Sequence, residues 1–275
     1  MARPMRYELP GALYHLTSKS CDAVLFKGDQ DRLGWIGILR SVMSRYRWRC
    51  LAWCQLEQHY HLVVSPLTGL LTQGMSQLNG RYTRFFNHRH QRKGKLFAGR
   101  FQALLVDEDR FLLPLVHEVL TEPQRLGLVD SPHSWPWSSA AALLGQGDSV
   151  VPLDLEPLHR HPAVTAAPQE FWPLYLSQAQ EQRLWDRVRH QLFLGDRQFV
   201  QRMQQRLPDM QSPDSRPSLQ SFRQRWDYQE GMARAYLEGH YTLQQIAAFY
   251  QVHPSTVSRQ VAAYEARHGL KDDHH

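Results

Sequence analysis

The stretch Leu56-Glu57-Gln58-His59-Tyr60-His61-Leu62-Val63-Val64 carries the strongest signal for both the fold and a site. It is typical of a β-strand, which alternates its side chains. His59 and His61 would then project from one face, while Tyr60 and Leu62 project from the other. Two imidazoles on one face can share a divalent ion. The same pattern also fits an ordinary strand that carries two histidines, and the flanking sequence has to decide between these interpretations.

The elements around this strand follow a β-α-β-β-α-β order. The preceding residues, 49–56, form a second predicted strand, and Glu57-Gln58 makes a tight turn, so the two strands should pair as a hairpin. The remaining strands are predicted at 12–19 and 98–106, and helices at 29–45, 70–88 and 109–122, the last closed by Pro123. This order predicts an α+β fold of the ferredoxin-like type with one further helix. Its antiparallel sheet would have helices on one face and the other face free for a ligand.

The composition changes after Gly145, which predicts four regions. Residues 1–145 form the first domain. Residues 146–168, rich in Pro, His and small residues, are predicted to be a linker or an irregular excursion. A helical region covers 169–218, with helical periodicity at 169–207 and a second linker at 209–218. Residues 219–275 form the last domain.

The last domain resembles a helix-turn-helix. Predicted helices at 232–237, 242–250 and 254–268 are separated by a short break at 251–253, and Thr242 is the expected N-cap. The apolar contacts would come from Leu243, Ile246, Ala247, Val252, Val257 and Val261. The exposed second helix would present Ser255, Thr256, Ser258, Arg259 and Gln260 to duplex DNA. An ordinary helical hairpin is the alternative, and the glycine often found in the turn is absent.

Charge distribution indicates an anionic partner. The chain has a net charge of +6 and a pI of about 9.3, and residues 81–100 contain no acidic residue. Basic side chains next to aromatic faces suit a single-stranded or hairpin nucleic acid. The candidate DNA-binding residues are Arg81, Tyr82, Arg84, Arg89, Arg92, Lys93, Lys95 and Arg100. The alternative is a solvated helix face whose aromatic residues belong to the core.

Size and cysteine content favour a protein of the cytoplasm. The chain has 275 residues and 42% hydrophobic content, enough to fill a core. No apolar run approaches the roughly 20 residues that span a bilayer, and the amino terminus has no signal-peptide core. Its 3 cysteines form no metal-type or disulfide pattern. Reduced thiols are therefore expected, with Cys50 and Cys54 in the core.

Several separated motifs resemble the REP-associated tyrosine transposases, which are HUH single-strand DNA transposases of the insertion-sequence type. The motifs are Ala2-Arg3-Pro4, Pro10-Gly11-Ala12-Leu13-Tyr14-His15-Leu16, His59-Tyr60-His61, residues 78–87, Gly99-Arg100-Phe101, residues 106–109 and Trp135-Pro136-Trp137-Ser138-Ser139. The resemblance is strong over residues 1–145 and extends to the terminal helix-turn-helix. It implies an HUH nuclease fold, DNA transposition chemistry and a bacterial, nucleoid-associated protein.

The resemblance also implies a mechanism. In the family, the two histidines and a polar residue from a later helix hold Mg²⁺ or Mn²⁺, and a tyrosine four residues before that polar residue attacks the scissile phosphate. Aligned on the flanking motifs, the tyrosine position falls on Glu118 and the third ligand on Glu122. No tyrosine occurs between Tyr82 and Tyr175. The implied metal ligands are therefore His59, His61 and Glu122, and the attacking hydroxyl is missing.

Three interpretations follow. The chain recognises structured DNA without strand transfer, as a repressor or an architectural factor. Alternatively, it is a metal-dependent nuclease that uses water activated near Glu118. In the third, it remains active in DNA transposition with a relocated tyrosine, Tyr82 or Tyr175. The sequence leaves open which metal binds, the target sequence, and whether two subunits pair as a homodimer.

Overall fold

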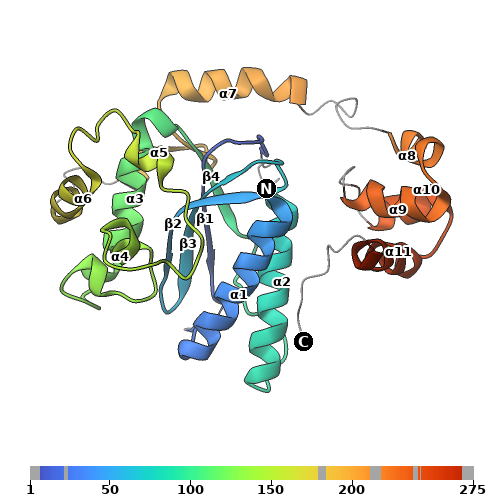
Figure 1. The fold of residues 1–275 in the computed structure, drawn as a ribbon, viewed down its shortest axis with the longest axis horizontal. Helices are drawn as coiled ribbons and strands as arrows, with labels where there is room; N and C mark the ends of the chain where they lie inside the picture. The colour runs from blue at the N-terminus through green and yellow to red at the C-terminus, as the bar shows by residue number, and fades with distance from the viewer. Residues whose placement is uncertain are drawn as a thin grey trace. The chain divides into compact units, whose positions relative to one another are not determined.

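The computed structural model describes residues 7–21, 24–178, 184–210, 218–237, 241 and 243–267 (Figure 1). The motif Ala2-Arg3-Pro4, the predicted cap Thr242 and most of the predicted linker 209–218 lie outside these ranges. The chain divides into two compact units, Met1–Arg202 and Met203–His275. No helix in the described ranges has the length and apolar character needed to cross a membrane.

One sheet organises the first unit. Its strands within the described residues are β1 (Tyr14–Lys19), β2 (Trp48–Gln55), β3 (His59–Pro66), β4 (Gln102–Val106), β5 (Val188–Arg189) and β6 (Phe193–Leu194), in the order β2-β3-β1-β4-β6-β5. The first four neighbours pair antiparallel, whereas β4 and β6 run parallel. The Leu56 amide donates to the carbonyl of His59 at 2.8 Å, which closes the predicted β2–β3 hairpin around Glu57-Gln58.

Two long helices, α1 (Asp29–Tyr46) and α2 (Leu71–Arg89), cover one face of the sheet (Figure 1). The ring of Trp35 on α1 packs 4.6 Å from the ring of Tyr60, centroid to centroid. The Tyr60 hydroxyl donates to Asn79 of α2 at 2.6 Å. Because side chains alternate along β3, this contact places His59 and His61 on the opposite face.

The opposite face is not free, which corrects the expected one-sided arrangement. Helix α3 (Glu108–Arg125) packs an apolar stripe that includes Val116 and Leu120 against Cys54 and Val63 of the sheet. A helix with so wide an apolar face has to bury it, and the apolar residues on this side of β2 and β3 provide the surface. Helices therefore lie on both faces, and α3 covers the β2–β3 half of the second one (Figure 1).

Helix α3 also runs further than predicted. Pro123 does not end it, and the helix continues to Arg125. So close to the end, the missing proline amide removes only one hydrogen bond of the helix. The amide of Leu126 still donates to the carbonyl of Glu122 at 2.9 Å. The extra turn brings Arg125 onto the face of the helix that carries Glu118 and Glu122.

Residues 146–168 are not a free linker. They contain the short helix α5 (Glu156–His159). Val151 and Leu158 are fully buried, and Leu158 belongs to the same apolar core as α3. The sequence pattern of Pro and small residues indicates an irregular path, but it does not reveal the scattered apolar anchors. The short elements α4 (Ala140–Leu143) and η1 (Pro132–Ser134) precede this segment.

The predicted helical periodicity over 169–207 is only partly correct. Helix α6 (Pro168–Ser177) and helix α7 (Arg197–Met210) flank a 3₁₀ turn, η2 (Leu184–Arg187), and the β5–β6 hairpin. The amide of Leu105 donates to the carbonyl of Leu192 at 2.8 Å, so this hairpin extends the sheet beyond β4. Strand β4 itself begins at Gln102 rather than Ala98.

The second unit is a set of short helices around its own core. They are α8 (Leu219–Arg225), α9 (Tyr228–Leu237), α10 (Leu243–Tyr250) and α11 (Pro254–Arg267). The predicted apolar contacts are present, with Ile246, Ala247, Val257 and Val261 buried and Leu243 and Val252 packed against them. Gln251 takes the left-handed conformation, with φ of 54°, at the turn between α10 and α11. It thus occupies the backbone conformation that favours glycine.

The cysteines agree with the sequence prediction. Cys50 and Cys54 are buried in the core and Cys21 is exposed, and all three are free. Burial raises the pKa of the Cys50 thiol to about 12 and holds the pKa of the Cys54 thiol well above its usual range. These two core thiols are therefore protonated and unreactive at neutral pH.

Candidate metal centre and nucleic-acid pocket

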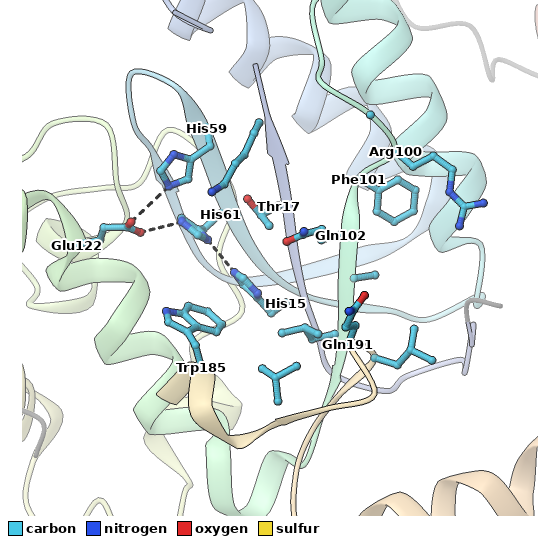
Figure 2. A pocket seen from close by; sticks show the side chains of 16 residues that line it. His15, Thr17, His59, His61, Arg100, Phe101, Gln102, Glu122, Trp185 and Gln191 are labelled. Atoms are coloured by element: carbon cyan, nitrogen blue, oxygen red, sulfur yellow. Dashed lines mark hydrogen bonds and ion pairs between the residues drawn. The ribbon is translucent and has the colours of Figure 1, made fainter. Parts of the chain in front are cut away.

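Strand β3 and helix α3 bring three donor side chains together. Nε2 of His61 lies 2.8 Å from one Glu122 carboxylate oxygen, and Nε2 of His59 lies 3.4 Å from the other (Figure 2). One ligand atom from each residue lies within 4.8 Å of the other two. Two imidazoles and a carboxylate, converging from two different elements, form a donor set that suits a divalent cation.

The protonation states of this group suit a cation. Burial raises the pKa of Glu122, but the adjacent His59 and His61 outweigh that effect and hold it well below its usual range. Burial lowers the pKa of His61, an effect that Glu122 only partly opposes. At neutral pH the carboxylate is therefore ionised and the His61 ring is neutral, the forms that bind metal.

One nitrogen of His61 has no hydrogen-bond partner among the described residues. Nε2 of His61 is buried and makes no hydrogen bond within the described part of the chain. The Glu122 oxygen at 2.8 Å meets the distance of an ion pair, but it does not lie along the direction of a ring N–H. A cation between the two would satisfy both, so the residues present fit a metal ion.

Glu118 lies apart from this donor group. Its buried carboxylate accepts hydrogen bonds from Arg125 Nη1 and, at 3.0 Å, from Trp185 Nε1. Among the described residues, the donor group consists of His59, His61 and Glu122. Two donors thus already engage the residue at the position implied for the nucleophile.

His15 is part of the site, although no role was predicted for it from the sequence. Its Nε2 lies 2.8 Å from Nδ1 of His61, and the two rings stack with centroids 5.0 Å apart. The indole of Trp185 packs against the other side of His15, also at 5.0 Å. Alternation along β1 provides a usable signal, because β1 pairs with β3 and carries His15, Thr17 and Lys19 on one face.

The donor group opens into a pocket of about 730 Å³ over β1 and β4 (Figure 2). Lys19 and Arg100 are the cationic residues that line it, and Phe101 contributes an aromatic ring. The other lining residues come from β1, β4, η2 and the β5–β6 hairpin and include Thr17, Gln102, Trp185, Val188 and Gln191. This size is typical of pockets that enclose a small molecule or one part of a larger ligand.

The basic residues of the predicted DNA-binding set differ in their exposure. Arg84, Arg89, Lys93, Lys95 and Arg100 are exposed, while Arg81 and Arg92 are half-buried. Arg89 pairs with the buried carboxylate of Asp31 at 3.3 Å, and Arg81 donates to Ser41 at 3.0 Å. Within the basic stretch, Lys95 and Arg100 also line a second cavity of about 630 Å³.

Tyr82 is a correction to the predicted DNA-binding set. Its side chain is fully buried, and its hydroxyl donates to the carbonyl of Leu25 at 2.8 Å. Phe86 and Phe97 are buried as well, and Phe85 packs so closely on α1 that a Cβ added at Gly34 would lie 2.4 Å from its ring. These aromatic residues belong to the core, and those on α2 pack that helix against α1 and the sheet.

In the second unit, the predicted contact residues lie on α11. Ser255, Ser258 and Arg259 are exposed and Thr256 is half-buried. Ser255 lies within hydrogen-bond distance of His253 Nδ1, at 2.8 Å. The contact of these residues with duplex DNA stays a prediction.

No family model and no curated protein matches this chain. The chain is similar in structure to a solved REP-associated tyrosine transposase bound to a REP hairpin, with a TM-score of 0.47 and 15% sequence identity. The similarity covers 56% of this chain and 93% of that one.

Proposed function

We propose that this protein binds single-stranded or hairpin DNA in the histidine pocket, with a divalent cation held by His59, His61 and Glu122, and that it does not perform tyrosine-mediated strand transfer. One observation carries the proposal. The three donors converge beside a pocket that offers Lys19 and Arg100, and none of its lining residues within the described ranges is a tyrosine.

The pocket residues suit a nucleic-acid strand. Lys19 and Arg100 would neutralise phosphates of a strand in the pocket. A divalent cation on His59, His61 and Glu122 would supply Lewis-acid polarisation of a phosphate oxygen. Two imidazoles and one carboxylate accommodate Mn²⁺ or Mg²⁺, of which Mn²⁺ accepts nitrogen ligands more readily.

Relocation of a tyrosine nucleophile has little support. Tyr82 is buried on the side of the sheet that α1 and α2 cover, with its hydroxyl bound to a backbone carbonyl. Tyr175 packs against Phe171 and His117 on α6 and α3 and does not line the pocket. We infer that phosphotyrosine chemistry is lost.

Hydrolysis by a metal-dependent endonuclease is the second candidate, because the cation site would survive the loss of the tyrosine. Glu118 is poorly placed to act as its general base, since Arg125 and Trp185 already engage the carboxylate. Binding without cleavage is therefore the main proposal, which suits a repressor or an architectural factor.

Two finer assignments accompany this proposal. The order β2-β3-β1-β4, with α1 and α2 as crossovers, supports a ferredoxin-like core of the HUH nuclease type. The turn between α10 and α11 and the exposed residues of α11 support a helix-turn-helix that contacts duplex DNA. Loss of duplex affinity in Arg259→Ala, with hairpin binding by the first unit retained, would test the second assignment.

The main test incubates labelled hairpin DNA with the full chain and Mn²⁺. We expect a complex without a covalent adduct under denaturing conditions and without strand cleavage. Cleavage that Glu118→Gln abolishes would support the endonuclease instead, and an adduct that maps to a tyrosine would refute the loss of phosphotyrosine chemistry. His133→Ala, an exposed histidine away from the pocket lining, serves as a control for His61→Ala.

A further inference from the structure

His15 contacts a metal ligand without belonging to the donor group. It is 3% exposed and lies on β1, opposite Val63 of β3. Its Nε2 faces Nδ1 of His61 at 2.8 Å, with the rings nearly parallel at 16°. At this distance one of the two nitrogens has to donate a hydrogen and the other has to accept it.

The two directions of this hydrogen bond have opposite consequences for metal binding. If His61 donates from Nδ1, its Nε2 carries a lone pair that faces Glu122 and is free to bind a cation. If His15 donates instead, the hydrogen of a neutral His61 lies on Nε2 and blocks that position. The tautomer of His61 therefore depends on what His15 does.

The surroundings favour the first direction. With a hydrogen on Nε2, His61 would be expected to bond to Glu122, yet Nε2 makes no hydrogen bond within the described part of the chain. On the far side of His15, the indole of Trp185 packs at 5.0 Å and is itself held by its hydrogen bond to Glu118. The His15 ring is thus fixed between two aromatic neighbours, with Nε2 pointing at His61.

We propose that His15 is a positioning residue of the metal centre: it accepts the Nδ1 hydrogen of His61 and so presents Nε2 of His61 as a metal ligand. The arrangement matches a general feature of metal sites, in which the second ring nitrogen of a histidine ligand has a fixed partner. The proposal rests on the proposed cation site. It also gives Glu118 a role, since that carboxylate orients the indole that packs against His15.

The test uses the full chain and Mn²⁺ alone. His15→Phe keeps a planar ring against Trp185 but removes the acceptor, whereas His15→Gln restores a carbonyl acceptor. By calorimetric titration we expect Mn²⁺ affinity to fall about 10- to 100-fold in His15→Phe, and His15→Gln to lie between that variant and the unaltered protein. If His15→Phe folds and binds Mn²⁺ as tightly as the unaltered protein, the proposal is overturned.

A second readout does not depend on metal. Long-range ¹⁵N–¹H correlation spectra of the metal-free, unaltered protein should show His61 with its hydrogen on Nδ1, and His15→Phe should move His61 towards the other tautomer. An Nε2–H form of His61 in the unaltered protein would refute the role of His15 even if His15→Phe does not fold. Failure of the unaltered protein to bind Mn²⁺ would refute the cation site instead. The tautomer of His61 in the metal-free protein would still test the role of His15.

Discussion

Glu122 on α3 lies 2.8 Å from His61 on β3, carboxylate oxygen to Nε2, and that contact joins the helix to the strand at the mouth of the pocket. The side chains of both residues are largely buried, at 14% and 8% exposure. An ionised carboxylate at such a position needs a cation or a hydrogen-bond donor close by. Nη2 of Arg125, 3.8 Å from the other Glu122 oxygen, supplies part of that charge, and a bound cation would add to it.

Mn²⁺ should stabilise the folded protein through this group. A ligand at about 100 times its Kd raises the free energy of unfolding by about 2.7 kcal/mol. We expect the Tm to rise with Mn²⁺ in the unaltered protein and in His133→Ala, but not in His61→Ala or Glu122→Ala. Differential scanning calorimetry measures the Tm. An equal rise in the Tm of His61→Ala would contradict the assignment of His61 as a metal ligand.

Acid should destabilise the protein. Burial lowers the pKa of His15 and of His61 below the ordinary value of 6.5. Below about pH 6.5, the unfolded chain binds protons that the folded rings do not, so the free energy of unfolding falls as the pH falls. Glu122 acts in the same direction below its ordinary value of 4.5, because its pKa is lowered in the folded state.

Urea denaturation across this pH range measures the effect. In His15→Phe one of the two buried imidazoles is gone, so the loss of stability between about pH 6.5 and 5 should be smaller. A pH dependence identical to that of the unaltered protein would show that His15 does not contribute.

Lys19 and Arg100 should bind phosphates in the pocket. For a single strand, removing one side chain that neutralises a phosphate makes the slope of log affinity against log salt shallower by about 0.7. The double variant Lys19→Ala, Arg100→Ala should therefore bind hairpin DNA more weakly and with a shallower salt slope. Arg160→Ala is the matched control, because Arg160 is 80% exposed and pairs with Glu156 on its own short helix. Fluorescence anisotropy measures the affinity for hairpin DNA at each salt concentration. An unchanged salt slope in the double variant would contradict phosphate binding in the pocket.

Tyr82→Phe should change stability rather than DNA binding. The hydroxyl is buried and donates to the carbonyl of Leu25, so its removal should lower the free energy of unfolding by about 1 kcal/mol. Hairpin affinity should not change. A loss of affinity at unchanged stability would return Tyr82 to the DNA-binding set.

Gln251→Gly should stabilise the second unit. Gln251 has a φ of 54° after α10, and the amide of Val252 donates to the carbonyl of Ala247 at 3.0 Å, the arrangement of a Schellman motif. An L residue in the left-handed conformation costs about 1–2 kcal/mol, of which the greater chain entropy of glycine offsets about 0.5–1 kcal/mol, so the glycine variant should raise the free energy of unfolding by about 0.5–1 kcal/mol. Gln251→Ala should give no such gain, and chemical denaturation compares the two variants.

Local pattern was sufficient for much of the first unit. Alternation in residues 56–64 predicts the strand, the turn at Glu57-Gln58 predicts the hairpin, and the helices at 29–45 and 70–88 agree with α1 and α2 to within a residue or so. Strand periodicity alone also predicts that His59 and His61 share a face. These features depend on neighbours close in the chain, and for that reason the sequence reveals them.

The third donor required more than local pattern. Glu122 was assigned from a resemblance, and Pro123 beside it predicts a helix end that does not occur. The partners of Glu118, namely Arg125 on the added turn and Trp185 from a distant segment, could not be read from the sequence. His15 had no predicted role because its contact with His61 depends on the register between β1 and β3.

The sequence by itself determined the two histidines on one strand face, the basic stretch and the absence of a tyrosine between Tyr82 and Tyr175, since each is a matter of composition or short-range periodicity. Tertiary structure alone decided that Tyr82 is buried, that Glu118 pairs with Arg125 and Trp185, and that the second face of the sheet is half covered. Those outcomes depend on which apolar surfaces meet across the fold. That choice minimises exposed apolar area over the whole unit and leaves no signature in any single segment.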